Sequence, residues 1–175
     1  GNEVAILDAD AERLSPEKTA FRIIKEAPRI ALFVVYGQNP NSGTTGMASV
    51  KAVMEHLANG KENVLLGVVG SHASALPRDV LSIQGIDFVL LNEGVYALRN
   101  LLAQGLKFDL PKVRGLGFNN QGPLGANAIL NTPERIVPQD RMDIDLPGYA
   151  WDLLPYRKRP LDMYRAHFWH AGFDF

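Results

Sequence analysis

The stretch that decides the fold is NVLLGVVGSHASALP, residues Asn63–Pro77. Its first half, Asn63–Val69, is apolar at nearly every position after the asparagine, which is typical of a strand buried on both faces of a parallel sheet. The run stops at Gly70, where the missing Cβ atom lets a ligand approach the backbone and allows a positive φ. Because ligands of parallel sheets bind beyond the carboxyl ends of the strands, this turn is either a binding turn or an ordinary glycine turn.

Strands and helices alternate on both sides of this stretch, with short connections. Together with Asn63–Val69 we expect strands at Glu3–Leu7, Ile30–Val35 and Ile86–Leu91. We expect amphipathic helices at Pro16–Glu26 and Met47–Ala58, a short helix at Arg78–Gln84, and a helix from Val95 that Gly105 caps. This alternation predicts an α/β fold with a doubly wound parallel sheet and helices on both faces.

The pattern changes after residue 105. Val113–Phe118 and Ala128–Leu130 flank a polar, glycine-containing segment, which predicts a hairpin or a small extra pair of strands. From Pro133 the chain is rich in Pro, Asp and Arg, and we interpret Pro138–Phe175 as an extended arm that packs on another surface. The chain is therefore divided into an α/β domain, 1–132, and a linker or arm, 133–175. Trp151, Leu153 and Leu154 are expected to be buried by docking back on the α/β domain.

Composition restricts the classes of partner and compartment. The chain has 175 residues, a formal net charge of −1 and no Cys. Near-zero charge argues against nucleic acid or an anionic membrane as the main partner. Without Cys the chain holds no disulfide, no thiolate zinc site and no Cys-ligated iron–sulfur cluster. No signal peptide or membrane-length apolar run is visible, so the expected location is cytoplasmic, and the initial Gly suggests a piece of a longer protein.

Polar, glycine-bearing loops follow three of the expected strands. They are Tyr36–Gly46, Gly70–Ala75 and Asn92–Gly94. Since the carboxyl ends of parallel strands share one edge, these loops are expected to form a wide, shallow cradle at a topological switch point. Backbone N–H groups and small hydroxyls suit a large polar ligand. The alternative is that these are ordinary turns, which are polar in every protein.

Other groups of candidate functional residues give weaker indications of a binding or catalytic site. Asp8 and Asp10 follow an expected strand, as the acidic residues of a receiver domain do, but no Lys follows Ile86–Leu91, so solvated turn acids are the better interpretation. His72 has no second His or carboxylate at ligand spacing. His167 and His170 lie beside aromatic residues, where packing is favoured over metal binding. Neither a nucleophile elbow nor a complete GxGxxG fingerprint is present, so no catalytic residue is assigned.

Five segments in order resemble the N-terminal region of cobalamin-dependent radical SAM enzymes. VGSHASALPRDVL (Val69–Leu81) is similar to the family's V-G-G-H-x-S-A-L-P turn, FVLLNEGVYALRNLL (Phe88–Leu102) to its G-E-G loop, and LPGYAWDLLP (Leu146–Pro155) to its A-W-D-L-L-P linker. YGQNPNSGTTGM (Tyr36–Met47) resembles the Y-G-Q loop of one branch. YRAHFWH (Tyr164–His170) resembles the segment before that branch's radical SAM barrel.

The resemblance implies a flavodoxin-like (Rossmann-like) sheet with cobalamin over its carboxyl edge and the cofactor's nucleotide tail among the strand-end loops. Carried over by position, the cofactor-binding residues would be Gly37, Gln38, Asn39, Thr44, Gly70, Ser71, His72, Glu93 and Gly94. His72 is assigned to the tail pocket and not to cobalt, so no metal ligand is implied. Ser71 and Asn92 stand where the family usually has Gly, which puts the shape of the tail pocket in question.

The family has a further strand and helix before the part that matches Gly1, and that strand would lie between Glu3–Leu7 and Ile30–Val35. The resemblance also implies a radical SAM barrel of the same polypeptide, with S-adenosylmethionine and a [4Fe-4S] cluster, beyond Phe175. This chain is then expected to hold cobalamin weakly, if at all, and to perform no chemistry alone. If the strand is absent, an open sheet edge invites dimerisation or aggregation. The alternative is a flavodoxin-like domain that has lost cobalamin and serves as an interaction or substrate-recognition module.

Overall fold

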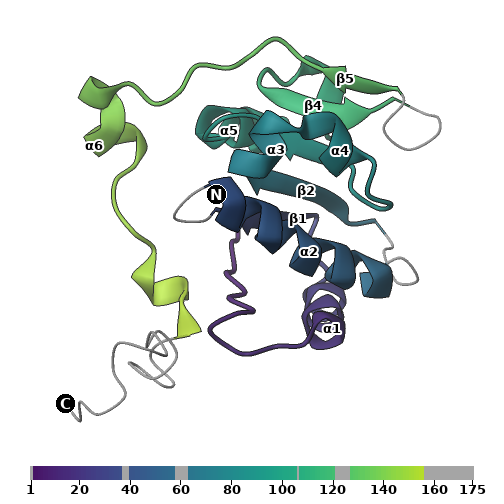
Figure 1. Cartoon of the computed structure of the whole chain (residues 1–175). Coiled ribbons are helices and arrows are strands. Elements are labelled where there is room, and N and C mark those ends of the chain that lie inside the picture. The colour runs from purple at the N-terminus through teal and green to yellow at the C-terminus, as the bar shows by residue number, and fades with distance from the viewer. Residues whose placement is uncertain (1, 37–39, 58–62, 106, 121–126, 156–175) are drawn as a thin grey trace.

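The computed structural model describes residues 2–36, 40–57, 63–105, 107–120 and 127–155. They form an α/β fold with one five-stranded sheet and helices on both of its faces (Figure 1). The strands are β1 (Ile30–Val35), β2 (Leu65–Gly70), β3 (Phe88–Leu90), β4 (Leu116–Asn119) and β5 (Ala128–Leu130). The α-helices are α1 (Pro16–Glu26), α2 (Pro40–Leu57), α3 (Ser71–Ala75), α4 (Pro77–Leu81), α5 (Val95–Ala103) and α6 (Met142–Asp145). The 3₁₀ turns are η1 (Leu110–Lys112), η2 (Gln139–Arg141) and η3 (Trp151–Leu153).

The sheet is mixed. β1, β2 and β3 are parallel neighbours, and β4 and β5 continue the sheet as antiparallel strands. The predicted flavodoxin-like α/β class and the predicted hairpin after residue 105 are confirmed. The order β1-β2-β3-β4-β5 does not reverse, however, so the expected topological switch point is not found among the described strands.

Two apolar cores cover the two faces of the sheet. On the first face, Val35, Leu66 and Val68 pack with the buried side of α2 and with α3 and α4. On the second face, Val69, Phe88 and further buried residues pack under α5. The apolar sequence of β2 is explained by this arrangement, because its side chains alternate between two buried cores.

The expected strand at Glu3–Leu7 is wrong. Residues 2–8 form no strand in the structure, and Val4 and Ile6 are exposed. Strand backbone needs a neighbour for its N–H and C=O groups, and no described strand lies beside this segment. The apolar, β-prone composition of Glu3–Leu7 predicted a strand, but the fold provides no neighbouring strand with which this segment could pair.

Helix positions were predicted well where a cap or a periodic face marks them. Pro16–Glu26 is a helix as predicted, with Ser15 as N-cap accepting a hydrogen bond from the Lys18 N–H and Pro16 at the first position. The loop expected at Tyr36–Gly46 is wrong in its second half, since α2 already begins at Pro40. Gly70–Ala75 is also no loop, because α3 begins at Ser71 directly after β2.

The arm after β5 departs from the sheet and carries short helical turns at η2, α6 and η3 (Figure 1). The prediction that Trp151 is buried is wrong, since its side chain is 58% exposed and contacts Tyr149, with the ring centroids 5.4 Å apart. Leu153 and Leu154 are half-buried. Residues 156–175, including His167 and His170, lie outside the described residues. No described helix has the length and apolar character needed to cross a membrane.

Candidate functional site

Polar groups from the segments after β1, β2 and β3 meet at one edge of the sheet. The Thr44 hydroxyl and His72 Nδ1 are 3.1 Å apart and share a hydrogen bond. Tyr36 Oη and Ser74 Oγ both donate to the carbonyl oxygen of Asn92, at 3.2 and 3.4 Å. The expected convergence of the three carboxyl-end segments on one edge is therefore confirmed for their described residues.

The groove found among the described residues is not lined by all three segments, as the cradle prediction required. A groove of about 650 Å³ lies on the second face of the sheet, beside α5. Its apolar lining comes from strands β1 to β3 and from α5, and Asn2, Tyr36, Glu93 and Gly94 also line it. Residues of Gly70–Ala75 do not line it. They pack on the other face of the sheet, against α2, so the expected single cradle is divided between two faces.

The glycines at this edge make room for the protein itself. A Cβ atom on Gly43 would stand 2.6 Å from Ser71 Oγ, and one on Gly70 would collide with the Val35 carbonyl oxygen. Gly70 also has φ +152°, a conformation that side chains disfavour. The part of α2 around Gly43 thus lies closely on the start of α3.

Ser71 is the polar group at this edge that the described residues leave unsatisfied. Its Oγ atom is buried and has no hydrogen-bond partner among them. A buried hydroxyl without a partner costs roughly 1–3 kcal/mol, so a group that accepts or donates here would be stabilised. Thr44, Ser71 and His72 therefore bring hydroxyl and imidazole groups together at this edge, and these groups can form hydrogen bonds.

Glu93 and Gly94 have partners within the protein. A Glu93 carboxylate oxygen accepts a hydrogen bond from the Val137 N–H of the arm at 3.0 Å. Burial and then the nearby Glu93 carboxylate raise the pKa of the Tyr36 hydroxyl. Gly94 has φ +70° at the start of α5 and packs against Leu90. Glu93 therefore joins the candidate edge to the arm.

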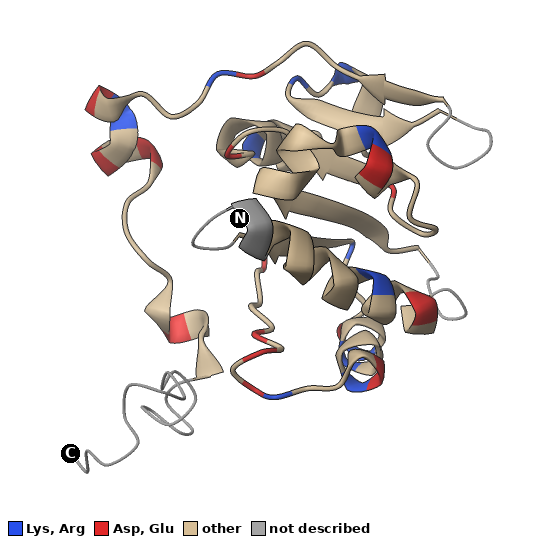
Figure 2. Ribbon diagram, in the orientation of Figure 1, with Lys and Arg blue, Asp and Glu red and all other residues tan. Residues whose placement is uncertain are grey.

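Charged side chains are absent from the part of the helical layer next to this edge. Lys, Arg, Asp and Glu lie on α1, the second half of α2, α4, α5 and the arm, whereas the first half of α2 and α3 have none (Figure 2). No group of three or more His, Asp or Glu side chains within the described residues is arranged to hold a metal ion. The first half of α2 and α3 therefore offer neutral hydrogen-bonding groups at this edge, whereas Glu93, in the segment after β3, is charged.

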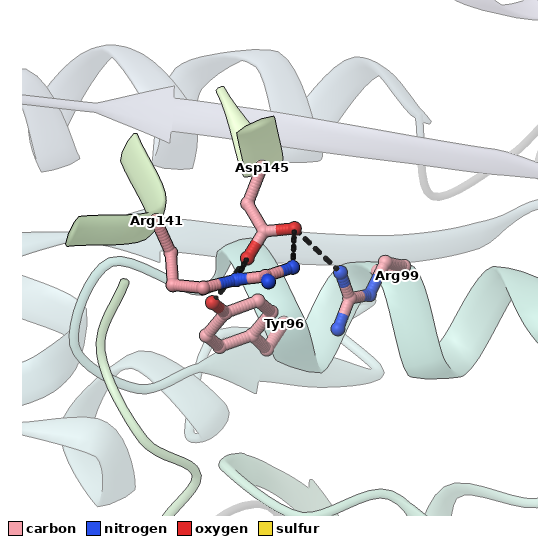
Figure 3. A network of polar contacts seen from close by, with 4 residues as sticks. All are labelled: Tyr96, Arg99, Arg141 and Asp145. Carbon is pink, nitrogen blue, oxygen red and sulfur yellow. Dashed lines mark hydrogen bonds and ion pairs between the residues drawn. The ribbon is translucent and has the colours of Figure 1, made fainter. Parts of the chain in front are cut away.

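A second polar cluster, centred on Tyr96 and Asp145, was not predicted from the sequence. Tyr96 Oη donates to Asp145 Oδ2 at 2.6 Å, and Arg141 donates to both Asp145 oxygens at 3.2 Å (Figure 3). Arg99 reaches the same carboxylate at 3.5 Å. The hydrogen bonds from Arg141 and Tyr96 lower the pKa of Asp145 to about 2.

This cluster fastens the arm to α5. The guanidinium groups of Arg99 and Arg135 lie over the ring of Tyr96, at 4.5 and 4.7 Å from its centroid. Tyr96 and Asp145 are 49 residues apart, so no local spacing could have indicated the pair. The sequence showed that the arm is rich in Arg and Asp, but this composition did not indicate which residues of the α/β domain these side chains contact.

The chain is similar in structure to a known protein, although the sequence comparisons find no match. No family model matches the chain, and no curated protein matches it significantly. The solved structure of apo, selenomethionine-labelled OxsB, a cobalamin-dependent S-adenosylmethionine radical enzyme, is similar with a TM-score of 0.46 and 16% sequence identity. The match covers 77% of this chain and 19% of that one, so the chain corresponds to about a fifth of that enzyme. At this TM-score and identity the likeness supports no conclusion on function.

Proposed function

We propose that this chain is the cobalamin-binding domain of a B12-dependent radical SAM enzyme. The observation that supports the proposal is the convergence of three motif segments at one edge. The hydrogen bonds Thr44–His72 and Ser74–Asn92 join the segments that resemble the family's Y-G-Q loop, its V-G-G-H turn and its G-E-G loop. Segments that are 18 and 28 residues apart in sequence are thereby in contact at the edge where such a cofactor would lie.

Thr44, Ser71 and His72 would hold the cofactor by hydrogen bonds to its amides and phosphate. Gly37, Gln38 and Asn39 lie outside the described residues and belong to the proposal on resemblance alone. Bound cobalamin would supply a methyl group or assist a radical step, and the protein would bind and orient it. The division into residues 1–132 and 133–175, the linked barrel, S-adenosylmethionine and the [4Fe-4S] cluster are parts of the same proposal.

One observation favours a second candidate, a flavodoxin-like interaction module without cofactor. Gly70, which stands at a cofactor-contacting position by resemblance, leaves no space between its backbone and Val35, and Gly43, beside Thr44, lies against Ser71. Cobalamin could enter there only if the first turns of α2 moved away from α3. The two candidates therefore differ in whether α2 can open at Gly43.

The test is retention of hydroxocobalamin. The chain is mixed with excess cofactor and desalted, and the visible spectrum of the protein fraction is recorded, followed by titration to obtain Kd. Under the proposal the cofactor is retained, and Ser71→Ala, which removes the unpartnered hydroxyl, weakens binding about tenfold, as the loss of one hydrogen bond to the ligand would.

Ser82→Ala is the matched control, because Ser82 Oγ donates within its own turn to the Asp79 carbonyl and lies away from the edge. It should leave Kd unchanged. If the chain folds but binds no cobalamin even when the cofactor is at millimolar concentration, the proposal of a cofactor-binding domain is wrong. The interaction module would then be the remaining candidate. Equal binding by both serine variants would show that cobalamin binds elsewhere.

A further inference from the structure

The Glu93 side chain stands on a turn whose backbone is anchored to neighbouring segments. Asn92 and Gly94, on either side of it, have positive φ values of +58° and +70°. The Asn92 carbonyl accepts hydrogen bonds from the hydroxyls of Tyr36 and Ser74. The backbone of the turn between β3 and α5 is therefore held in place, whereas the Glu93 side chain is exposed and has to be fixed by other contacts.

One hydrogen bond from the arm fixes the Glu93 carboxylate. Its Oε2 atom accepts from the Val137 N–H at 3.0 Å, and no described residue is found to donate to Oε1. A carboxylate can accept hydrogen bonds at both of its oxygens. The arm therefore restrains the rotamer of Glu93 and leaves one oxygen for a ligand.

The Glu93 carboxylate lies near the candidate edge as well as near the arm. Glu93 lines the groove together with Tyr36 and Gly94. Burial and then the nearby Glu93 carboxylate raise the pKa of the Tyr36 hydroxyl. That hydroxyl is one of the groups that meet at the edge, where it donates to the Asn92 carbonyl. Glu93 is thus placed between the arm and the edge.

The arm is attached on both sides of Val137. Before it, the Thr132 carbonyl accepts a hydrogen bond from the Gly115 N–H at 2.8 Å. After it, Asp145 accepts from Tyr96, which belongs to the first turn of α5. The Val137 side chain itself is only 7% exposed. Attachment of the arm therefore determines whether the Val137 N–H is present at Glu93.

We propose that the arm sets the affinity of the candidate edge for its ligand by holding the Glu93 carboxylate in place, an inference that rests on the proposed function, in which Glu93 contacts cobalamin. N–H donors such as carboxamides fit Oε1, because a carboxylate accepts hydrogen bonds and repels a phosphate. A glutamate that is already ordered loses less conformational entropy when the ligand binds. Arm attachment and ligand binding therefore favour each other, and this coupling is reciprocal.

The coupling is tested with hydroxocobalamin and a proline substitution. Val137→Pro removes the N–H that Glu93 accepts and should raise Kd about threefold to tenfold, because the Glu93 rotamer must then be fixed on binding. Ile136→Pro is the matched control, since the Ile136 N–H has no hydrogen-bond partner among the described residues. It should leave Kd unchanged. Circular dichroism shows whether both variants keep the folded sheet.

A double-mutant cycle shows whether the effect passes through Glu93. Glu93→Ala lacks the carboxylate, so Val137→Pro should change Kd no further when it is added to this variant. If the proline instead weakens binding equally in both backgrounds, the effect does not pass through Glu93 and the proposed coupling is wrong.

Release of the arm at its second attachment gives an independent measurement. Asp145→Asn, which removes the charge that holds the arm to α5, should also raise Kd, whereas Asp143→Asn should not. Because the coupling is reciprocal, saturating hydroxocobalamin should slow tryptic cleavage of the unchanged chain after Arg135 and Arg141 several-fold.

Different results would reject the coupling and the proposed function. If hydroxocobalamin binds but Val137→Pro and Asp145→Asn leave Kd unchanged, the arm does not set the affinity, while cobalamin binding itself stands. If both variants bind more tightly and the cofactor speeds cleavage of the arm, the arm competes with the ligand for Glu93, which also overturns the coupling. If the unchanged chain folds but binds no hydroxocobalamin, both proposals are wrong.

Discussion

Gly70 shows how a residue singled out as a ligand contact is required by the fold itself. Its missing side chain was interpreted as space for a ligand, but a Cβ atom there would collide with the Val35 carbonyl oxygen. The contact joins the ends of β1 and β2, which pair at Val35 and Gly70. The sequence indicated correctly that this position needs glycine. The structure shows that the requirement comes from the close contact with Val35 and not from a bound ligand.

Gly70→Ala is therefore expected to destabilise the whole domain and not to affect ligand binding selectively. Backbone strain at φ +152° and the forced shift of β1 should together lower the free energy of unfolding by roughly 2–5 kcal/mol. Urea unfolding followed by circular dichroism gives this value. Gly105→Ala is the control, because Gly105 has φ +75° with open space around its Cβ position, and it should cost only about 1–2 kcal/mol. Equal losses in the two variants would show that the Val35 contact is unimportant.

The Asp145 carboxyl gives a pH-dependent prediction at the same scale. Arg141 and Tyr96 lower its pKa from 3.8 to about 2 when the arm is attached to α5. A lowered pKa means that the carboxylate stabilises the attached arm fully above pH 3.8, and that this contribution is lost as the pH falls toward 2. Titration of the Asp145 side-chain carboxyl carbon by NMR should show a midpoint near 2, and Arg141→Met should raise it. A midpoint at 3.8 in the unchanged chain would contradict the observed cluster.

Sequence patterns located most elements because caps, periodicity and apolar runs are local signals. Ile30–Val35 and Pro16–Glu26 have the predicted bounds, since an uncharged run and a Ser-Pro cap determine them within a few residues. Glu3–Leu7 failed because a strand also requires a neighbour, which is a property of the fold. The early start of α2 at Pro40 was missed because its first turns are rich in Gly, Ser and Thr, residues typical of loops.

Asn131 is an element-scale contact that local patterns could not reveal. Its Nδ2 group donates to the carbonyls of Leu110 and Val113, at 2.8 and 2.7 Å, and so joins the end of β5 to η1. Asn131→Ala would leave both partly buried acceptors without this donor and should lower the free energy of unfolding by roughly 1–3 kcal/mol. Asn100→Ala is the control, because the Asn100 side chain donates to Glu134 in an exposed position. Thermal unfolding of both variants measures the difference, and a loss no larger in Asn131→Ala than in the control would contradict the role.

At the scale of the whole molecule, the arm and the α/β body are joined by polar contacts and few apolar ones. Val137 is buried, and its N–H donates to Glu93, while Met142, Ile144, Leu146 and Tyr149 are exposed. Sequence analysis identified the arm as a separate segment, but it expected apolar docking through Trp151. The long-range partners that do hold the arm, Tyr96 with Asp145 and Glu93 with Val137, depend on the path of the chain and leave no local signature.

Asp145→Asn should therefore release the arm while the sheet stays folded. The amide keeps the size of the side chain but loses the charge that Arg99 and Arg141 approach, and it can no longer accept as strongly from Tyr96 Oη. Arg135 and Arg141 are exposed, but cleavage by trypsin also needs the backbone around them to unfold locally, which attachment of the arm opposes. Cleavage there should therefore become several-fold faster, as mass spectrometry of the fragments would show. Asp143→Asn, on the exposed side of the same short helix, should leave the rate unchanged. If Asp145→Asn is cleaved no faster than Asp143→Asn while its circular dichroism is unaltered, the arm is held by Val137 and Glu93 without help from the Tyr96 cluster.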